Sequence, residues 1–415
     1  MMTKGNGTRR VVVTGLGVVT PIGLNVADFW SSMKAGKSGV SELGGFPLED
    51  LKILIAAQIK GFDPKVQLKG YKRDKIIMHA DRYSWFAAAA AAEAVEQSGL
   101  EFPLENPYRT ACIIGSGAGG LTTFENAYRD LFIHNKRATN PLTLLRIIGS
   151  SASAHVGIEY GIKGPTFATC SACSTASHAI GIARDYIQND LADVAIAGAS
   201  ESVINYGTMK AWQALHVLSP QGCFPFAKKR NGTVLGEGAG ILILEEYEHA
   251  KRRGATILAE LSGYGMASDS QDMVKPTVEG PSFAMNMALE DAGIEASEID
   301  YLNAHGTATR DNDINETRAI KEVFKNAASK LAISSTKSMT GHALGAGGGI
   351  EAVACIKAMQ ENWVPPTIGL DEADPECDLD YIPNEGRNLT VNYAMSNSFA
   401  FGGLNAVIVF GPPPA

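Results

Sequence analysis

Short runs of β-branched and aliphatic residues, several closed by glycine, alternate along this chain with helical stretches. A short, continuous apolar run predicts a strand that is buried on both faces of a sheet. Such runs cover residues 10–17, 111–115, 194–198, 240–244, 299–304, 331–334 and 406–409. Amphipathic or alanine-rich stretches predict helices over residues 82–96, 174–189, 282–291 and 349–360. Strands that alternate with helices predict an α/β chain with mainly parallel sheets.

The order of these elements is roughly duplicated, which predicts two similar halves. A cysteine motif around Cys173 precedes one predicted helix, and His342 precedes a Gly-rich helix entry near Gly349. We therefore expect an N-terminal half over residues 10–260 and a C-terminal half over residues 261–411. Residues 34–75 and 130–145 follow neither period, and we expect them to cover a site or a subunit contact.

Charge and hydropathy exclude several classes of function. The chain has 44 acidic and 36 basic residues without a long run of either sign. It therefore lacks the clustered positive charge that is typical of a nucleic-acid-binding protein. No apolar run approaches the roughly 18 to 20 residues that span a membrane. The polar first ten residues and six scattered cysteines predict reduced thiols and a cytoplasmic location.

Cys173 is the most informative of the six cysteines. It lies where a short strand runs into the helix predicted from Ser174. The free N–H groups and the dipole of a helix N-terminus lower the pKa of a thiol and stabilise the oxyanion formed when a thioester carbonyl is attacked. The position therefore predicts a nucleophilic thiolate at neutral pH.

Three other interpretations of Cys173 are open from the residues alone. A free cysteine is commonly a small buried hydrophobe. Cys170 and Cys173 also form a C-x-x-C pair, which elsewhere marks a redox dithiol or half of a zinc site. The other cysteines are isolated and no two histidines stand at ligand spacing, so we expect no metal.

His305 and His342 each follow a predicted strand and have glycine neighbours. The ends of strands in open α/β sheets are where ligands bind. A cysteine with two histidines is typical of covalent acyl chemistry, in which the imidazoles polarise a carbonyl or move a proton. Asp313 and Glu316 are expected near the start of a helix, and Lys337 is expected to pair with one of them.

Taken together, ordered motifs over nearly the whole chain resemble the β-ketoacyl-acyl carrier protein synthases of the thiolase superfamily, and among them the synthase II type. The motifs are residues 10–23, Ala172-Cys173-Ser174, 235–240, 303–309, 337–345 and 397–405. The resemblance implies a thiolase-like fold of two pseudo-repeated βαβαβαββ halves in a layered αβαβα architecture. It also implies decarboxylative Claisen condensation of a malonyl unit with an acyl group on Cys173.

The resemblance also assigns expected roles to individual residues. Cys173, His305 and His342 would form the catalytic triad, with Lys337 and Glu316 as a supporting ion pair. Phe401 would be a gate residue whose N–H completes the oxyanion hole with that of Cys173. Further gate and substrate contacts are expected from Phe399, Ala400, Thr307, Thr309, Trp212, Gly402 and Gly403.

Partners follow from the same resemblance. The chain is expected to act on acyl carrier protein bearing acyl and malonyl groups, without a metal or organic cofactor. It would work as a homodimer or as a heterodimer with a chain-length-factor subunit. Such a factor lacks the nucleophile, whereas this chain keeps Cys173. A thiolase would carry a second reactive cysteine in a Gly-rich C-terminal loop, which the Gly402-Gly403 loop lacks.

Departures from the family pattern favour a specialised synthase over a housekeeping one. The family usually has Pro and Gly at positions 310 and 312, where this chain has Arg310 and Asn312. It has Arg-Pro-Phe-Asp at residues 224–227, where this chain reads Phe-Pro-Phe-Ala. At residues 400 and 404 the chain has Ala and Leu in place of Gly and Thr. A polyene, polyketide or signal-molecule acyl chain is therefore an expected product.

Overall fold

One mixed sheet of ten strands organises the protein, of which the computed structural model describes residues 9–70 and 72–414. The strand order is β10-β9-β13-β14-β8-β1-β7-β6-β4-β5. The N-terminal half supplies β1 (Val11–Val19), β4 (Thr110–Gly115), β5 (Thr166–Phe167), β6 (Val194–Glu201) and β7 (Gly238–Glu246). The C-terminal half supplies β8 (Ala259–Ser268), β9 (Tyr301–Asn303), β10 (Ala332–Ser334), β13 (Ala394–Ala400) and β14 (Leu404–Gly411). The two halves therefore have the same strand order, read outward from the sheet centre.

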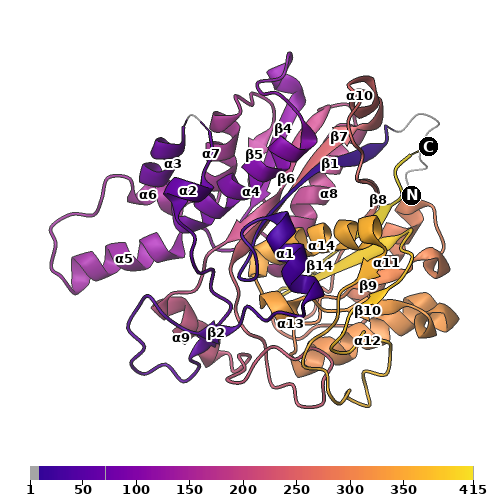
Figure 1. The fold of residues 1–415 in the computed structure, drawn as a ribbon. Helices are drawn as coiled ribbons and strands as arrows, with labels where there is room; N and C mark the ends of the chain where they lie inside the picture. The colour runs from indigo at the N-terminus through magenta and orange to yellow at the C-terminus, as the bar shows by residue number, and fades with distance from the viewer. Residues whose placement is uncertain (1–8, 71, 415) are drawn as a thin grey trace.

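Six main helices complete the same βαβαβαββ order in both halves (Figure 1). They are α4 (Arg82–Ser98), α7 (Ser151–Glu159), α8 (Thr175–Gln188), α11 (Glu279–Ala292), α12 (Arg310–Phe324) and α14 (Gly347–Glu361). Residues of α8 and α14 share a central apolar cluster, while α4 and α7 pack in a second and α11 and α12 in a third. The result is the layered αβαβα arrangement that the resemblance implied.

Shorter elements connect this framework. They are α1 (Val26–Lys34), α2 (Pro64–Gln67), α3 (Arg73–His79), α5 (Leu121–Phe132), α6 (Thr143–Ile147), α9 (Tyr206–Ala214), α10 (Tyr247–Arg252), α13 (Lys337–Thr340), β2 (Ser41–Glu42), β3 (Ile55–Ala56), β11 (Trp363–Val364) and β12 (Arg387–Asn388). Five single turns of 3-10 helix cover residues 107–109, 172–174, 296–298, 325–329 and 344–346. Among the described residues, no helix is long and apolar enough to cross a membrane.

The prediction of mainly parallel pairing is wrong. Strand β4 is parallel to β5 and β6, and β9 is parallel to β10 and β13. The pairs β1–β7, β6–β7, β13–β14, β8–β14 and β1–β8 are antiparallel, because β7 and β14 each run back along the strand that precedes them in the chain. The sheet is therefore mixed.

A short antiparallel contact joins the two halves of the sheet. Val12 pairs with Glu260 and Val13 pairs with Ala259. The division of the chain near residue 260 stays a prediction.

Candidate active site

Cys173 lies in the single 3-10 turn that leads directly into α8. The α-helix begins at Thr175, one residue later than predicted, and Ala172 just before the cysteine has a positive φ of 47°. The thiol is 6% exposed and lines an internal cavity. Cys173 is thus buried, as the alternative interpretation expected, but it faces a cavity. The other cysteine of the C-x-x-C pair, Cys170, is exposed, and both are free thiols.

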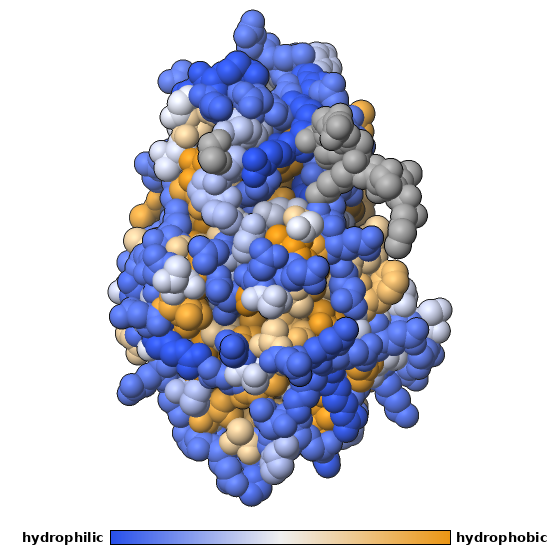
Figure 2. All heavy atoms as spheres, turned by 90° about the vertical axis from the view of Figure 1, so that its right-hand side faces the viewer, coloured by the Kyte–Doolittle hydropathy of each residue, from blue (hydrophilic) through white to orange (hydrophobic). Residues whose placement is uncertain are grey.

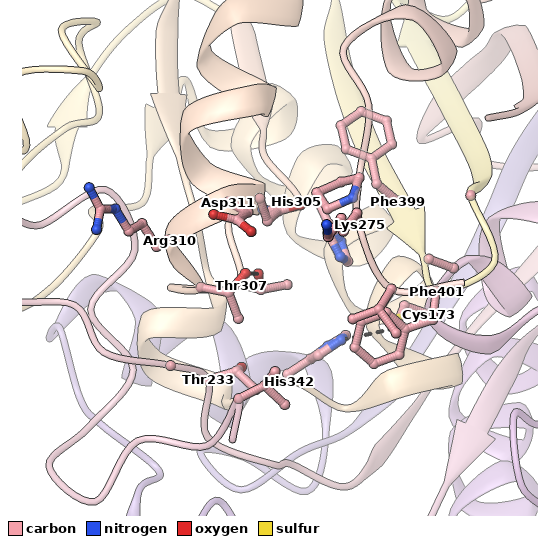
Figure 3. A pocket seen from close by; sticks show the side chains of 18 of the residues that line it. Cys173, Thr233, Lys275, His305, Thr307, Arg310, Asp311, His342, Phe399 and Phe401 are labelled. Atoms are coloured by element: carbon pink, nitrogen blue, oxygen red, sulfur yellow. Dashed lines mark hydrogen bonds between the residues drawn. The ribbon is translucent and has the colours of Figure 1, made fainter. Parts of the chain in front are cut away.

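His342 points its Nε2 atom at the Cys173 sulfur, 3.1 Å away (Figure 3). Its backbone is fixed on both sides, because its N–H donates to Val234 O at 2.7 Å and its carbonyl accepts from Gly236 N at 2.8 Å. Among the described residues, the Nδ1 atom of His342 has no hydrogen-bond partner. No acceptor in the described part of the chain therefore holds a proton on Nδ1, and whether Nε2 accepts from or donates to Cys173 Sγ depends on the tautomer.

His305 lies in the loop that follows β9 and, like His342, is close to the Cys173 sulfur. The backbone N–H of His305 donates to Glu316 Oε1 at 2.8 Å, and that of Gly306 donates to Glu316 Oε2 at 2.7 Å. The rings of His305 and His342 lie 5.4 Å apart and nearly perpendicular. One ligand atom each from Cys173, His305 and His342 falls within 4.8 Å of the others. The structure thus brings together the three residues expected to form the triad.

Burial controls the protonation of all three side chains. It raises the pKa of Cys173 to about 12, against the opposing effects of Lys337 and the backbone N–H of Phe401. Burial thus opposes the thiolate that a helix N-terminus favours, and the expectation of a resting thiolate stays a prediction. Burial, together with the nearby Lys337 charge, lowers the pKa of His305 and His342 well below 6.5. These shifts favour a neutral thiol and two neutral imidazoles.

Lys337 pairs with Glu351 of α14 and not with Glu316, so the predicted Lys337–Glu316 ion pair is wrong. Both partners are almost fully buried. Glu316 is occupied by the backbone N–H groups of His305 and Gly306 and by the Asn397 side chain, and Asp313 binds the N–H groups of Phe226 and Ala308. Lys337 therefore finds its counter-ion on the helix that follows His342.

The turn between β13 and β14 carries the expected gate residue. The Phe401 ring stacks on Trp212, with ring centroids 5.7 Å apart and an interplanar angle of 25°. Ala400 closes β13 with a negative φ, whereas Gly402 and Gly403 have φ values of 83° and 67°. The positive-φ positions of this turn are thus the two glycines, and Ala400 is unstrained.

A cavity of about 410 Å³ connects these residues to the surface. Thr307 and Thr309 line it, with their hydroxyl oxygens 2.9 Å apart, and so do Trp212, Phe399, Ala400 and Gly403. Gly402 and Leu404 are not among its lining residues; Leu404 packs in the apolar cluster next to Cys173. The cavity therefore gives a ligand access to the thiol and to both imidazoles.

The same three side chains are the one group among the described residues whose geometry resembles a metal site. They offer one thiol and two imidazoles, and the nearby buried cation Lys337 opposes the binding of a second positive charge. Structural zinc takes four ligands, and ligating histidines usually donate their second N–H to an acceptor, which neither Nδ1 atom finds here. The donor set thus fits acyl chemistry better than metal binding.

Several site residues were missed by the sequence analysis. Glu351 is a lone acid in an otherwise apolar stretch from Ile350 to Ile356, and that isolation was the available signal. Asp272, Met273 and Lys275 line the cavity from a loop without any regular period, so nothing in the sequence indicated them.

Comparison with known proteins decides the family. Residues 8–250 match the N-terminal domain of β-ketoacyl synthases and residues 258–371 match the C-terminal domain. The chain belongs to the β-ketoacyl synthase family. Nodulation protein E of Rhizobium meliloti (strain 1021) is 44% identical over 97% of this chain and 99% of its own length. The 3-oxoacyl-[acyl-carrier-protein] synthase 2 of Coxiella burnetii is 43% identical, covering 97% of this chain and 98% of its own.

Solved structures agree with this assignment. The ishigamide ketosynthase/chain length factor superposes on the synthase with a TM-score of 0.92 at 32% identity. The match covers 98% of this chain and all of the other. The thiolase-like fold and the acyltransferase class are thereby established for this synthase.

Proposed function

We propose that this synthase condenses an acyl group held on Cys173 with a malonyl unit, and that both arrive on acyl carrier protein. The observation that supports this proposal best is the 3.1 Å contact between Cys173 Sγ and His342 Nε2 in a cavity that His305 also lines. Such a thiol, base and second imidazole supply what both half-reactions need.

The first half-reaction transfers the acyl group. Cys173 Sγ attacks the thioester carbonyl as its proton moves to His342 Nε2, which offsets the high thiol pKa. The backbone N–H groups of Cys173 and Phe401 both act on the sulfur and stand ready to stabilise the oxyanion. The intermediate expels the carrier thiolate, which takes the proton from His342.

The second half-reaction makes the carbon–carbon bond. Neutral His305 and His342 donate to the malonyl thioester oxygen, so the electron pair of the breaking C–CO₂ bond is held as an enolate. Carbon dioxide leaves, the α-carbon attacks the acyl-Cys173 carbonyl, and the expelled Cys173 thiolate takes one proton from solvent. Because no acceptor among the described residues holds a proton on Nδ1, His342 Nε2 can accept a proton in one half-reaction and donate in the other.

A substitution at the nucleophile tests the first half-reaction. After incubation with acyl carrier protein, the intact wild-type chain should gain the acyl mass and Cys173→Ala should not. Cys170→Ala is the matched control, since it removes the exposed thiol of the same pair. Acylation that survives in Cys173→Ala, or that depends on Cys170, contradicts the assignment.

Histidine substitutions test the second half-reaction. His305→Ala and His342→Ala remove donors from a preorganised site, which costs on the order of 100-fold or more in rate. We expect malonyl decarboxylation, measured as released carbon dioxide, to fall by at least that amount in each variant, while His305→Ala still accepts the acyl group. Decarboxylation at the wild-type rate in either variant overturns the role of that histidine.

The acyl chain we propose is linear, rigid or of moderate length. Trp212 narrows the cavity beside the gate, and the volume of about 410 Å³ leaves little room for a long flexible chain. The similarity to nodulation protein E and to the ishigamide ketosynthase favours a specialised pathway. A reducing compartment such as the cytoplasm keeps Cys173 and its five companions as thiols.

A subunit partner of the same fold completes the proposal. Helix α5 has no buried residue, and Phe124, Tyr128 and Phe132 form an exposed stripe of contacting rings along it. In Figure 1 α5 projects from the body on the left. The opposite face, shown in Figure 2, is mainly hydrophilic with scattered apolar side chains. An exposed aromatic stripe of this kind is typical of a protein–protein contact. We propose that a second copy of this chain binds to it, with a chain-length-factor subunit as the other outcome.

A further inference from the structure

A buried carboxylate behind the nucleophile has no role in the chemistry proposed above. Glu201 is the last residue of β6 and is fully buried. It does not line the catalytic cavity. Its side chain accepts three hydrogen bonds, from Ser116 Oγ at 2.9 Å, Gly117 N at 2.8 Å and Gly345 N at 3.1 Å.

These donors belong to two segments that each lead to a reacting side chain. Ser116 and Gly117 follow β4 and touch the chain just before the nucleophile, because Ser116 N donates to Thr169 O and Cys170 Sγ contacts Gly117 O. Gly345 lies three residues after His342, in the 3-10 turn Leu344–Ala346. A single carboxylate thus connects the approach to Cys173 with the segment that carries His342.

Both glycines allow this contact by having no side chain. A Cβ atom at Gly117 would lie 2.8 Å from Glu201 Oε2, and one at Gly345 would lie 2.7 Å from the same atom. The two segments also touch each other there, since a Cβ at Gly345 would be 2.7 Å from Gly117 N. The carboxylate is therefore seated between two backbones that approach closely, where small displacements would reach both Cys173 and His342.

We infer that Glu201 is a positioning residue that fixes the loop after β4 against the segment after His342 and so sets the Cys173–His342 geometry for acyl transfer. The inference rests on the proposed function, because it concerns the same thiol and imidazole. A misplacement of about 1 Å at a reacting pair costs on the order of 100-fold in rate.

The charge of Glu201 and its positioning role have opposite effects on the reactivity of the Cys173 thiol. Burial raises the pKa of Glu201 to about 7, against the opposing effect of its hydrogen bonds, so the carboxylate is charged above that pH. When it is charged, it helps to raise the pKa of Cys173, after the larger effect of burial. Removal of the charge should ease formation of the thiolate, whereas loss of the two N–H contacts should disturb the geometry. The two effects can therefore be measured separately.

Glu201→Leu makes this separation. Its side chain has a similar size but lacks the charge and both acceptor oxygens, so the N–H groups of Gly117 and Gly345 lose their partner. We expect transfer of the acyl group from carrier protein to Cys173 to slow by about 10- to 100-fold. Alkylation of Cys173 by iodoacetamide, followed by peptide mass spectrometry, should stay equal or become faster, since it needs only the thiolate. Ser116→Ala, which deletes one donor and leaves the charge, should slow acyl transfer less.

Glu237→Leu is the matched control. Glu237 is also buried, also accepts three hydrogen bonds, from Ile59 N, Ser202 Oγ and Arg82, and also does not line the cavity. Its substitution should lower Tm without changing the ratio of acyl transfer to alkylation. If Glu201→Leu transfers acyl groups at the wild-type rate, or if both rates fall together, the inference is overturned. Failure of the wild-type chain to accept any acyl group would instead overturn the proposed function.

Discussion

The buried ion pair of Lys337 and Glu351 sets the charge balance beneath the two catalytic histidines. The Lys337 cation favours neutral imidazoles, which is the donor state that decarboxylation needs. Burial raises the pKa of Glu351, while Lys337 opposes that rise. The pair therefore influences activity through protonation and influences stability through its own desolvation.

Lys337→Met should lower both the melting temperature and the condensation rate. Loss of one partner from a buried pair strands the other and costs about 3 to 5 kcal/mol. The double variant Lys337→Met/Glu351→Gln removes the stranded charge, so it should recover most of the lost melting temperature in a calorimetric scan. An inactive Lys337→Met with wild-type Tm would indicate that the lysine acts directly on substrate.

Sequence alone could predict which residues react but not every contact they make. Cys173, His305 and His342 stand at strand ends or helix starts, and local pattern locates such positions. The partner of Lys337 lies fourteen residues away on a helix whose rotation depends on packing against α8 and β7. The pKa of Cys173 depends on burial, which a helix N-terminus in the sequence does not report.

At the scale of elements, the β13–β14 hairpin joins paired strand ends by a turn that contains two glycines with positive φ. Ala400 and Leu404 pair across the hairpin, so the strands hold the gate on both sides. Gly402 N donates to Met273 O and Asp269 N donates to Gly403 O, which ties the turn to the loop after β8. Movement of Phe401 therefore requires changes at Gly402 and Gly403 and the loss of its stack on Trp212.

Gly402→Ala should slow the second half-reaction more than the first. The φ of 83° disfavours any side chain, although the space around Gly402 is open, so the penalty is one of backbone conformation. Trp212 fluorescence should change when the wild type is acylated and change less in Gly402→Ala, with Trp212→Phe identifying the signal. Ala400→Gly should behave as wild type. A strong gain of rate in Ala400→Gly would place the hinge there instead.

Fold prediction succeeded for the elements with strong local patterns. The strand around residues 111–115 and the Ala-rich helix α4 are formed as expected. Strands β8 and β13 were missed because their sequences are rich in glycine, serine and alanine, so neither shows an apolar run. Each of them forms a strand because the neighbouring strands on its two sides supply backbone hydrogen bonds. These partners are present only in the assembled sheet.

At the scale of the whole molecule, the exposed stripe on α5 is the clearest unpaired surface. Asp81 holds the start of this helix to α4 by accepting from Thr123, and Glu125 binds Gly207 N of α9, so α5 is attached near its beginning while its aromatic stripe stays exposed. Leu121 at its start packs in the cluster around Cys173. A subunit seated on α5 would thereby also support the wall of the acyl cavity.

Phe132→Asp should therefore weaken the dimer. A charge in the centre of an apolar interface is unpaired and desolvated, so we expect the mass measured by light scattering to fall toward that of one chain. Phe283→Asp is the control, because Phe283 is a similarly exposed phenylalanine on α11. An unchanged mass for Phe132→Asp, or a wild type that is monomeric alone and dimeric only with a chain-length factor, would exclude the second copy as the occupant.

The two halves of the sheet contribute different catalytic side chains. The N-terminal half contributes the thiol at the start of α8, and the C-terminal half contributes both imidazoles from the loops after β9 and α13. Within the described sheet, two residue pairs between β1 and β8 join the halves. The thiol and its proton acceptor therefore meet only when residues from both ends of the chain are folded around the shared apolar cluster of α8 and α14.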